Sequence, residues 1–179
     1  MPAHSLKLYA KWELGKKSYR VNHYIQEVRL GENYELAESE NFIGTAGEMV
    51  APEVKTYEGF TSPEKQYYEL QVSDDMEVFN YYYQRNSYNV TIDRNDGSEN
   101  ITLEPVYEAK IEYRPEKMGY QFAGWYLDKE LKQEFDGTVP AKDLTLYAKW
   151  EAQDVSYSVR HYLQNANDDG YTSAGTESF

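Results

Sequence analysis

Three histidines are the residues best suited to acid–base or metal chemistry in this chain, because the sequence contains no cysteine. His23 and His161 occupy the same place in two similar stretches, SYRVNHYIQ at 18–26 and SYSVRHYLQ at 156–164, while His4 stands alone. One histidine per stretch offers no second ligand or base nearby in the sequence. We therefore expect His23 and His161 to be hydrogen-bonded residues at the edge of a core, with no metal site and no cofactor.

Three short motifs resemble catalytic or ion-binding loops without matching them. GKKS at 15–18 lacks the upstream glycine and the residue order of a phosphate loop. YTSAG at 171–175 lacks the first glycine of a nucleophile elbow. In DRNDG at 93–97 the glycine comes one residue too early for a calcium loop, which favours a plain hairpin turn. The sequence thus predicts that the chain is not an enzyme.

Nineteen tyrosines form the other chemically useful group, since exposed rings on a rigid sheet can stack on sugar faces. Most are explained more simply as cross-strand pairs that stiffen small domains with thin cores. The better ligand-binding candidates recur on the more variable face of the repeated strand. They are Tyr24, Gln26, Tyr162 and Gln164.

These candidates lie within an internal repeat with an offset of 138 residues. LKLYAKWE at 6–13 returns as LTLYAKWE at 144–151, and residues 6–26 agree with 144–164 at 13 of 21 positions. A fainter echo continues, with a slip of one residue, to Phe42 and Phe179. We expect the chain to be a window on a longer repeating array.

Period-two alternation predicts β-strands as the elements that carry these residues. Tyr19, Val21, His23 and Ile25 share one face of 19–26 and recur in the second copy with one change, so we expect this face to be buried. Further strands are predicted at 34–43, 66–72, 77–84, 88–93, 100–106 and 120–127. Helix has room only at 45–51 and 108–113, which end before Pro52 and Pro115.

The net charge of −13 argues against two classes of partner. Phosphate backbones and anionic membrane surfaces would both repel the chain, so we expect no nucleic acid and no membrane contact by this segment. The longest apolar runs are only a few residues, too short for a membrane span.

Residues 88–150 resemble the Listeria–Bacteroides repeat, the B-repeat type of internalin-like surface proteins. The matching positions are Val90-Thr91, Asp93, Asn95, Gly97, Gly119-Tyr120, Phe122, Gly124-Trp125-Tyr126, Asp128, and Asp143 through Trp150. Asp96 stands where that family usually has glycine, a departure that affects only the turn.

Residues 17–84 are similar to a mucin-binding-protein (MucBP) repeat, through VNHYIQ, Tyr57-Glu58-Gly59-Phe60 and VFNYYYQ. The two resemblances imply a mainly β (α+β) fold of tandem small β-grasp, ubiquitin-like domains with one short helix each, in an elongated arrangement. The implied segments are a tail strand of a preceding repeat at 1–15, a MucBP-like repeat at 16–85, a Listeria–Bacteroides type repeat at 86–151 and the start of the next MucBP-like repeat at 152–179.

Both families occur on wall-anchored proteins of Gram-positive bacteria, so the resemblance implies an extracellular, cell-surface location. We expect a non-enzymatic repeat segment of an adhesin that acts as a stalk for a distal domain. The alternative is direct, weak, multivalent binding of mucin glycans or host glycoproteins by the MucBP-like unit. A third interpretation is contact with neighbouring repeats through unpaired sheet edges of the strands at 6–13 and 156–164.

Overall fold

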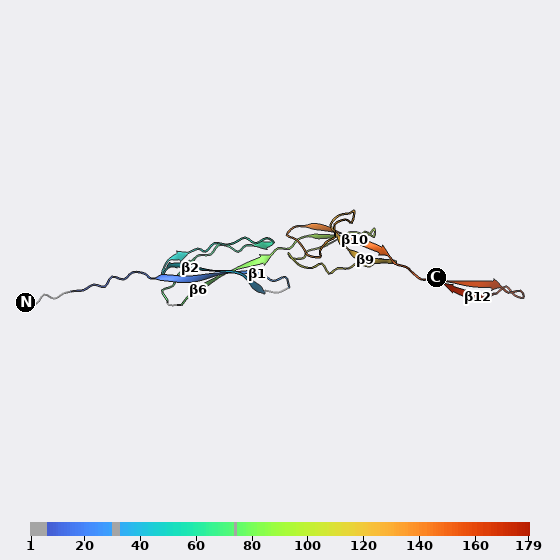
Figure 1. Cartoon of the computed structure of the whole chain (residues 1–179), viewed down its shortest axis with the longest axis horizontal. Helices are drawn as coiled ribbons and strands as arrows, with labels where there is room; N and C mark the ends of the chain where they lie inside the picture. The colour runs from blue at the N-terminus through green and yellow to red at the C-terminus, as the bar shows by residue number, and fades with distance from the viewer. Residues whose placement is uncertain (1–6, 30–32, 74) are drawn as a thin grey trace, which may run out of the picture. The chain divides into compact units, whose positions relative to one another are not determined.

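The computed structural model describes residues 7–29, 33–73 and 75–179, so His4 and Leu6 lie outside the described residues. Within these ranges the chain forms β-strands and no helix (Figure 1). The strands are β1 Lys16–Gln26, β2 Tyr34–Thr45, β3 Met49–Val50, β4 Phe60–Thr61, β5 Tyr68–Glu69, β6 Glu77–Arg85, β7 Val90–Asp93, β8 Ile101–Leu103, β9 Tyr120–Tyr126, β10 Leu144–Ala152, β11 Ser158–Gln164 and β12 Tyr171–Ser178.

The expected α+β fold, with one short helix in each β-grasp domain, is therefore wrong for the described residues. At 45–51 the chain turns instead, because Gly47 has a positive φ of 78° and its N–H donates to the Leu70 carbonyl at 2.6 Å. At 108–113 Glu108 has a φ of 62°, and its N–H donates to the carbonyl of Val139 at 2.9 Å. Backbone groups with distant partners cannot close the local hydrogen bonds that a helix needs.

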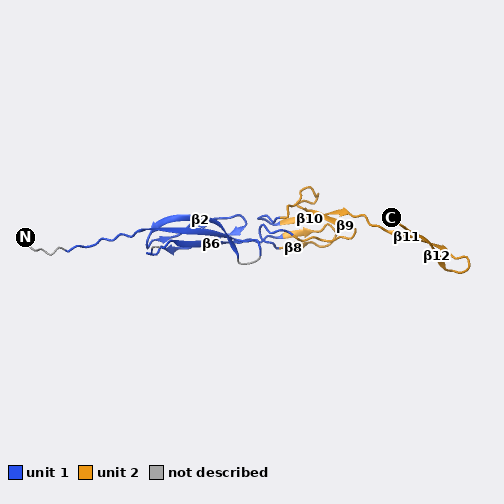
Figure 2. Ribbon diagram, turned by 60° about the horizontal axis from the view of Figure 1, so that its bottom comes forward, with its two compact units in different colours: residues 1–89, 104–111, 138–143 blue, residues 90–103, 112–137, 144–179 orange. Residues whose placement is uncertain are grey.

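The described residues fall into two compact units (Figure 2). Unit 1 takes its residues from 1–89, 104–111 and 138–143, and unit 2 takes its residues from 90–103, 112–137 and 144–179. Residues 104–111 and 138–143 therefore belong to unit 1, although the segments before and after them in the sequence belong to unit 2.

Unit 1 is built on a four-stranded sheet with the order β2-β1-β6-β4. Strand β1 pairs antiparallel with β2 and parallel with β6, and β3 and β5 form a separate two-stranded ribbon. The core contains Tyr19, Val21, Leu70, Tyr81 and Tyr83. Alternation along β1 puts Tyr19, Val21 and His23 inside, as the sequence predicts for this face.

Unit 2 is built on a second four-stranded sheet with the order β8-β7-β10-β9. Its central strand β10 pairs parallel with β7 and antiparallel with β9, and it buries Leu146 and Ala148 completely or almost so. The turn between β7 and β8 contains Gly97 with a φ of 83°, in agreement with the predicted hairpin turn.

The repeated segments of the chain have different surroundings in the two copies. Residues 8–13 have the same sequence as residues 146–151 of β10, but they form no strand among the described residues, and Trp12 is 88% exposed. Strands β11 and β12 pair only with each other in the described residues, and every residue of both strands is exposed.

Candidate functional site

The predicted residue Tyr24 belongs to a group of three tyrosine rings on the outer face of unit 1. Its ring stacks on Tyr82 at 5.3 Å between centroids, and Tyr34 meets Tyr82 edge-on at 5.0 Å. Tyr24 is half-buried, whereas Tyr82 is 48% exposed. The ring most available to a ligand in this group is therefore Tyr82, which the sequence-based prediction did not select.

Gln26 is held in a structural contact rather than pointing freely to solvent. Its side-chain oxygen accepts the backbone N–H of Arg85 at 3.0 Å, and its backbone oxygen accepts from Arg85 Nε at 2.6 Å. The structure thus commits the oxygen of the Gln26 side chain to the sheet.

Tyr162 and Gln164 lie on β11 in unit 2 and are exposed, Tyr162 to 53%. The prediction that Tyr24, Gln26, Tyr162 and Gln164 bind a ligand stays a prediction. Tyr24 and Gln26 are half-buried in a packed sheet, whereas Tyr162 and Gln164 are open to solvent.

Behind the tyrosine group, His23 sits in a buried polar network. Its Nδ1 lies 2.8 Å from the hydroxyl of Tyr83, which also accepts the backbone N–H of Lys55 at 2.9 Å. On the other side of the ring, Nε2 is 3.7 Å from a carboxylate oxygen of Glu40 and has no hydrogen-bond partner. Burial first, and then the charge of Lys55, lower the pKa of His23 below its ordinary value, so the ring is neutral at pH 7.

Lys55 closes this network on the solvent side. Its ammonium group pairs with Glu38 at 2.6 Å and with Glu40 at 2.8 Å. Burial opposes the charge on Lys55, but hydrogen bonds to both carboxylates outweigh it and raise the lysine pKa. Hydrogen bonding to Lys55 likewise lowers the pKa of Glu38. Because Glu38 and Glu40 are both paired with Lys55, neither carboxylate is positioned to act as a general base.

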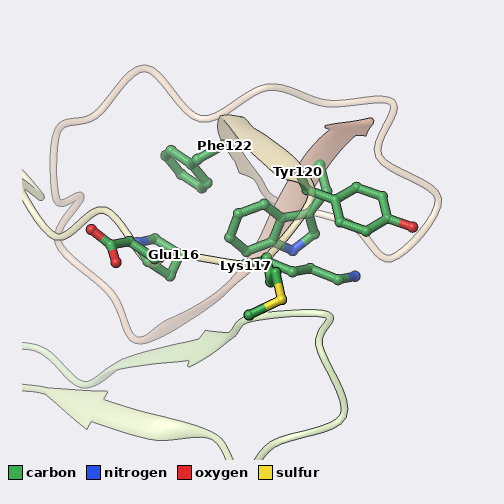
Figure 3. Close-up of a pocket in the computed structure, with 7 residues that line it drawn as sticks. Glu116, Lys117, Tyr120 and Phe122 are labelled. Atoms are coloured by element: carbon green, nitrogen blue, oxygen red, sulfur yellow. The ribbon is translucent and has the colours of Figure 1, made fainter. Parts of the chain in front are cut away.

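An aromatic groove in unit 2 was missed by the sequence-based reasoning. It is an open space of about 600 Å³ lined by Pro115, Glu116, Lys117, Met118, Tyr120, Phe122 and Trp150 (Figure 3). Antiparallel pairing of β9 with β10 places Phe122 opposite Trp150, and their ring centroids are 5.8 Å apart. The sequence signal for this groove was the alternation of Tyr120 and Phe122 in one predicted strand, together with Trp150 in another. Only the register of β9 against β10 brings these rings together.

Lys117 shapes the chemistry of this groove. Its ammonium nitrogen lies 4.5 Å from the centroid of the Tyr120 ring and 5.7 Å from that of Trp150. The indole N–H of Trp150 donates to the Arg94 carbonyl at 2.7 Å, which fixes the ring. The groove offers ring faces, the Lys117 cation and the Glu116 carboxylate for contact with a ligand.

Two further findings limit the chemistry of the described residues. No group of three or more histidine, cysteine, aspartate or glutamate side chains within them could hold a metal ion. No helix among them is long and apolar enough to cross a membrane.

Comparison with known proteins found one family whose model matches part of the chain. Residues 88–149 match the Listeria-Bacteroides repeat domain, which confirms the resemblance stated for this region. This family is a repeat-domain family and not an enzyme family. The resemblance of residues 17–84 to a MucBP repeat stays a prediction.

Two proteins of Evansella cellulosilytica are similar over most of the chain. One is named "Putative Gly-rich membrane protein" and is 32% identical over 156 residues, which are 80% of this chain. The other is named "Putative membrane protein" and is 28% identical over 164 residues, or 86% of this chain. The chain spans 17% and 24% of the lengths of these two proteins.

Proposed function

We propose that this chain is a non-enzymatic repeat segment of a bacterial cell-surface adhesin and acts as a spacer that presents a distal domain. The observation that carries the proposal is the match of residues 88–149 to a repeat domain, next to an internal repeat with an offset of 138 residues. Similarity to much longer proteins that are named membrane proteins supports a place within a larger surface molecule.

Backbone hydrogen bonds within unit 1 order the segment between β6 and β7. Asn86 N–H donates to the Gly59 carbonyl at 2.9 Å, and Tyr107 N–H donates to the Asn86 carbonyl at 2.8 Å. Tyr88 N–H donates to the carbonyl of Pro105 at 3.0 Å. The residues that lead out of β6 are therefore an ordered part of this unit and not a free linker.

Small-angle scattering of the chain in solution tests the spacer function. A compact globule of this length would have a radius of gyration of about 16 Å, and the unfolded chain about 45 Å. We expect a value clearly between these two, unchanged by salt, from a sample whose amide protection shows that it is folded. A value of about 16 Å would overturn the proposal.

A second candidate function is weak, multivalent binding of mucin glycans or host glycoproteins. Exposure of Tyr82 beside Tyr24 favours it, because adjoining ring faces suit the apolar faces of sugars. A glycan and glycoprotein array should show saturable binding by the folded chain if this function is present. Binding should be lost in Tyr82→Ala and in a Tyr24→Ala, Tyr162→Ala double variant, and kept in Tyr120→Ala on the other unit.

A further inference from the structure

One face of the unit 1 sheet carries cations and no carboxylate. Paired residues of neighbouring strands share a face, so the register of β1 shows which side chains lie on it. From β1 this outer face carries Lys16, Ser18, Arg20, Asn22, Tyr24 and Gln26. Every residue paired with them on β2 and β6 is uncharged, although the chain has 31 aspartate and glutamate residues.

The acidic residues in the middle of β2 lie on the opposite, inner face. Glu38 is paired with His23, which is buried. Glu40 is paired with Val21, which is buried as well. Both carboxylates bind Lys55 on that side, at 2.6 Å and 2.8 Å. The sheet therefore separates charge, with carboxylates on the inner side and cations on the outer side.

The guanidinium of Arg20 is available to an anion on this outer face. Its Nε donates to Oδ1 of Asn41 at 3.1 Å, and no carboxylate of the described residues lies within ion-pair distance of it. A guanidinium has further N–H donors on its two Nη atoms, which stay open to a ligand. Because arginine can only donate, the oxygen of the Asn41 amide is turned toward Arg20 and its NH₂ group is directed away.

A chain of hydrogen bonds crosses the centre of the outer face and ends on a free donor. Ser39 Oγ donates to Asn22 Oδ1 at 2.7 Å, and Asn22 Nδ2 donates to Asn80 Oδ1 at 3.0 Å. The amide nitrogen of Asn80 has no acceptor among the described residues, and the residue is half-buried. Asn80, Asn41 and Arg20 therefore all offer N–H donors to a ligand.

Tyr82 adds an apolar contact beside these donors. It follows Asn80 by two residues on the same face of β6, stacks on Tyr24 and is 48% exposed. Arg20 precedes Tyr24 on β1 by about 13 Å, at the rise of an extended strand. A ligand that reaches both the tyrosine ring and the guanidinium must therefore be longer than a single sugar ring.

We infer that this outer face binds an acidic oligosaccharide, with a sugar ring against Tyr82, a polar oxygen at Asn80 and a carboxylate or sulfate group at Arg20. Carboxylate and sulfate groups only accept hydrogen bonds, which suits a face whose free groups are donors. A neutral sugar presents hydroxyl groups that also donate, and on this face they find no carboxylate to accept them. The inference rests on the second candidate function, glycan binding, and names the class of glycan.

The net charge of −13 does not oppose binding at this face under physiological conditions. Exposed charges act over only about 8 Å at physiological ionic strength, so the charges nearest the ligand decide. On this face those charges are Lys16 and Arg20.

The test titrates the folded 179-residue chain, labelled with ¹⁵N, with oligosaccharides of equal length. A keratan sulfate fragment carries sulfate groups, a hyaluronan fragment carries carboxylates, and an unsulfated N-acetyllactosamine fragment is the neutral match of the first. At least one acidic fragment should bind at least about tenfold more tightly than the neutral one, and less tightly as salt rises. The signals that shift should be those of β1 and β6 and the side-chain amide of Asn80. The acidic fragment that binds more tightly shows whether the anion is a carboxylate or a sulfate.

Two pairs of variants test the charge of the face. Arg20→Gln should weaken binding of the acidic fragment about tenfold and leave binding of the neutral one unchanged. Lys132→Gln, which removes the same charge from an exposed position of unit 2, should change neither. Asn80→Asp can still accept from Asn22 but adds a carboxylate, and it should abolish binding of the acidic fragment, whereas Asn100→Asp on unit 2 should not. Unchanged amide protection of β1 shows that each variant is folded.

The outcomes separate this inference from glycan binding in general. Equal or tighter binding of the neutral fragment at the same residues would overturn the inference and leave the second candidate function in place. Binding of an acidic fragment at other residues, or full binding by Arg20→Gln, would do the same. The absence of binding by every fragment at about 1 mM would overturn both. The spacer function does not depend on any of these results.

Discussion

At the scale of single residues, the hydroxyl of Tyr83 connects the side chain of His23 with the backbone of Lys55. It bonds His23 Nδ1 at 2.8 Å and accepts the Lys55 backbone N–H at 2.9 Å, and its side chain is fully buried. Tyr83→Phe leaves both partners unsatisfied, at a cost of about 1–3 kcal/mol for each buried group. The neighbouring Tyr82→Phe is the control and should change the free energy of unfolding by less than about 0.5 kcal/mol. Equal losses in urea denaturation would show that the Tyr83 hydroxyl has no special role.

His23 should make the stability of unit 1 depend on pH. Burial holds its folded pKa below the ordinary value of 6.5, so the unfolded chain binds the proton more tightly. The contribution of His23 to the free energy of unfolding is therefore fully present above the pKa of the unfolded chain. It is lost as the pH falls from that value to the lower pKa of the folded state. Glu38 also has a lowered pKa, but its contribution is lost only below its ordinary value of 4.5.

Urea denaturation between about pH 7 and pH 5 separates the histidine from the carboxylate. We expect the free energy of unfolding to fall over this range in the native chain and to stay nearly flat in His23→Gln. His161→Gln, on the open hairpin, should keep the fall. The same slope in His23→Gln as in the native chain would contradict the prediction.

At the scale of elements, Arg85 is the last residue of β6 and connects this strand with β4 and with residues 107–108. Its guanidinium lies over the Phe60 ring at 4.7 Å, donates to the Tyr107 carbonyl at 3.1 Å and pairs with Glu108 at 2.6 Å. Arg85→Met should cost about 1–3 kcal/mol, because it removes the donor from part-buried acceptors. Amide exchange at residues 104–111 should increase with it. Arg20→Met, at a more exposed position of β1, should cost less than about 1 kcal/mol.

Gly59 and Gly97 offer a matched test of close packing. Both have positive φ angles, 78° and 83°, but a Cβ at Gly59 would lie 2.2 Å from the Tyr107 ring, and one at Gly97 would meet nothing within 4 Å. Gly97→Ala should cost about 1 kcal/mol for the backbone conformation alone. Gly59→Ala should cost at least about 2 kcal/mol more, because the ring must move. Similar midpoints of thermal unfolding for the two variants would exclude this packing role.

For each element, the success of the sequence-based prediction depended on whether its backbone hydrogen bonds go to segments that are near or distant in the sequence. The buried face of β1 followed from alternation, because a strand that is covered on one side must separate its apolar residues with period two. The strand predicted at 66–72 is only Tyr68–Glu69 in the structure. The helix predicted at 45–51 is a turn followed by β3, and the one predicted at 108–113 contains an isolated bridge at Lys110. Those segments bond to chain far away in sequence, which local patterns do not encode.

Charge dominates the behaviour expected of the whole molecule. With a net charge of −13, copies of the chain should repel one another at pH 7 and low salt. The second virial coefficient from light scattering should therefore be positive at about 20 mM salt and fall as salt rises toward about 500 mM. A negative coefficient at low salt would instead reveal self-association strong enough to overcome the charge.

The sequence by itself determined the repeat, the strand character, the buried face of β1 and the match of residues 88–149 to a repeat domain, because these rest on local order and composition. Only the tertiary structure decided that helix is absent from the described residues, that Tyr82 rather than Tyr24 is the open ring, and that Trp150 forms a groove with Phe122. Each of these depends on strand register and on contacts between distant segments, and identical stretches of sequence can differ in both.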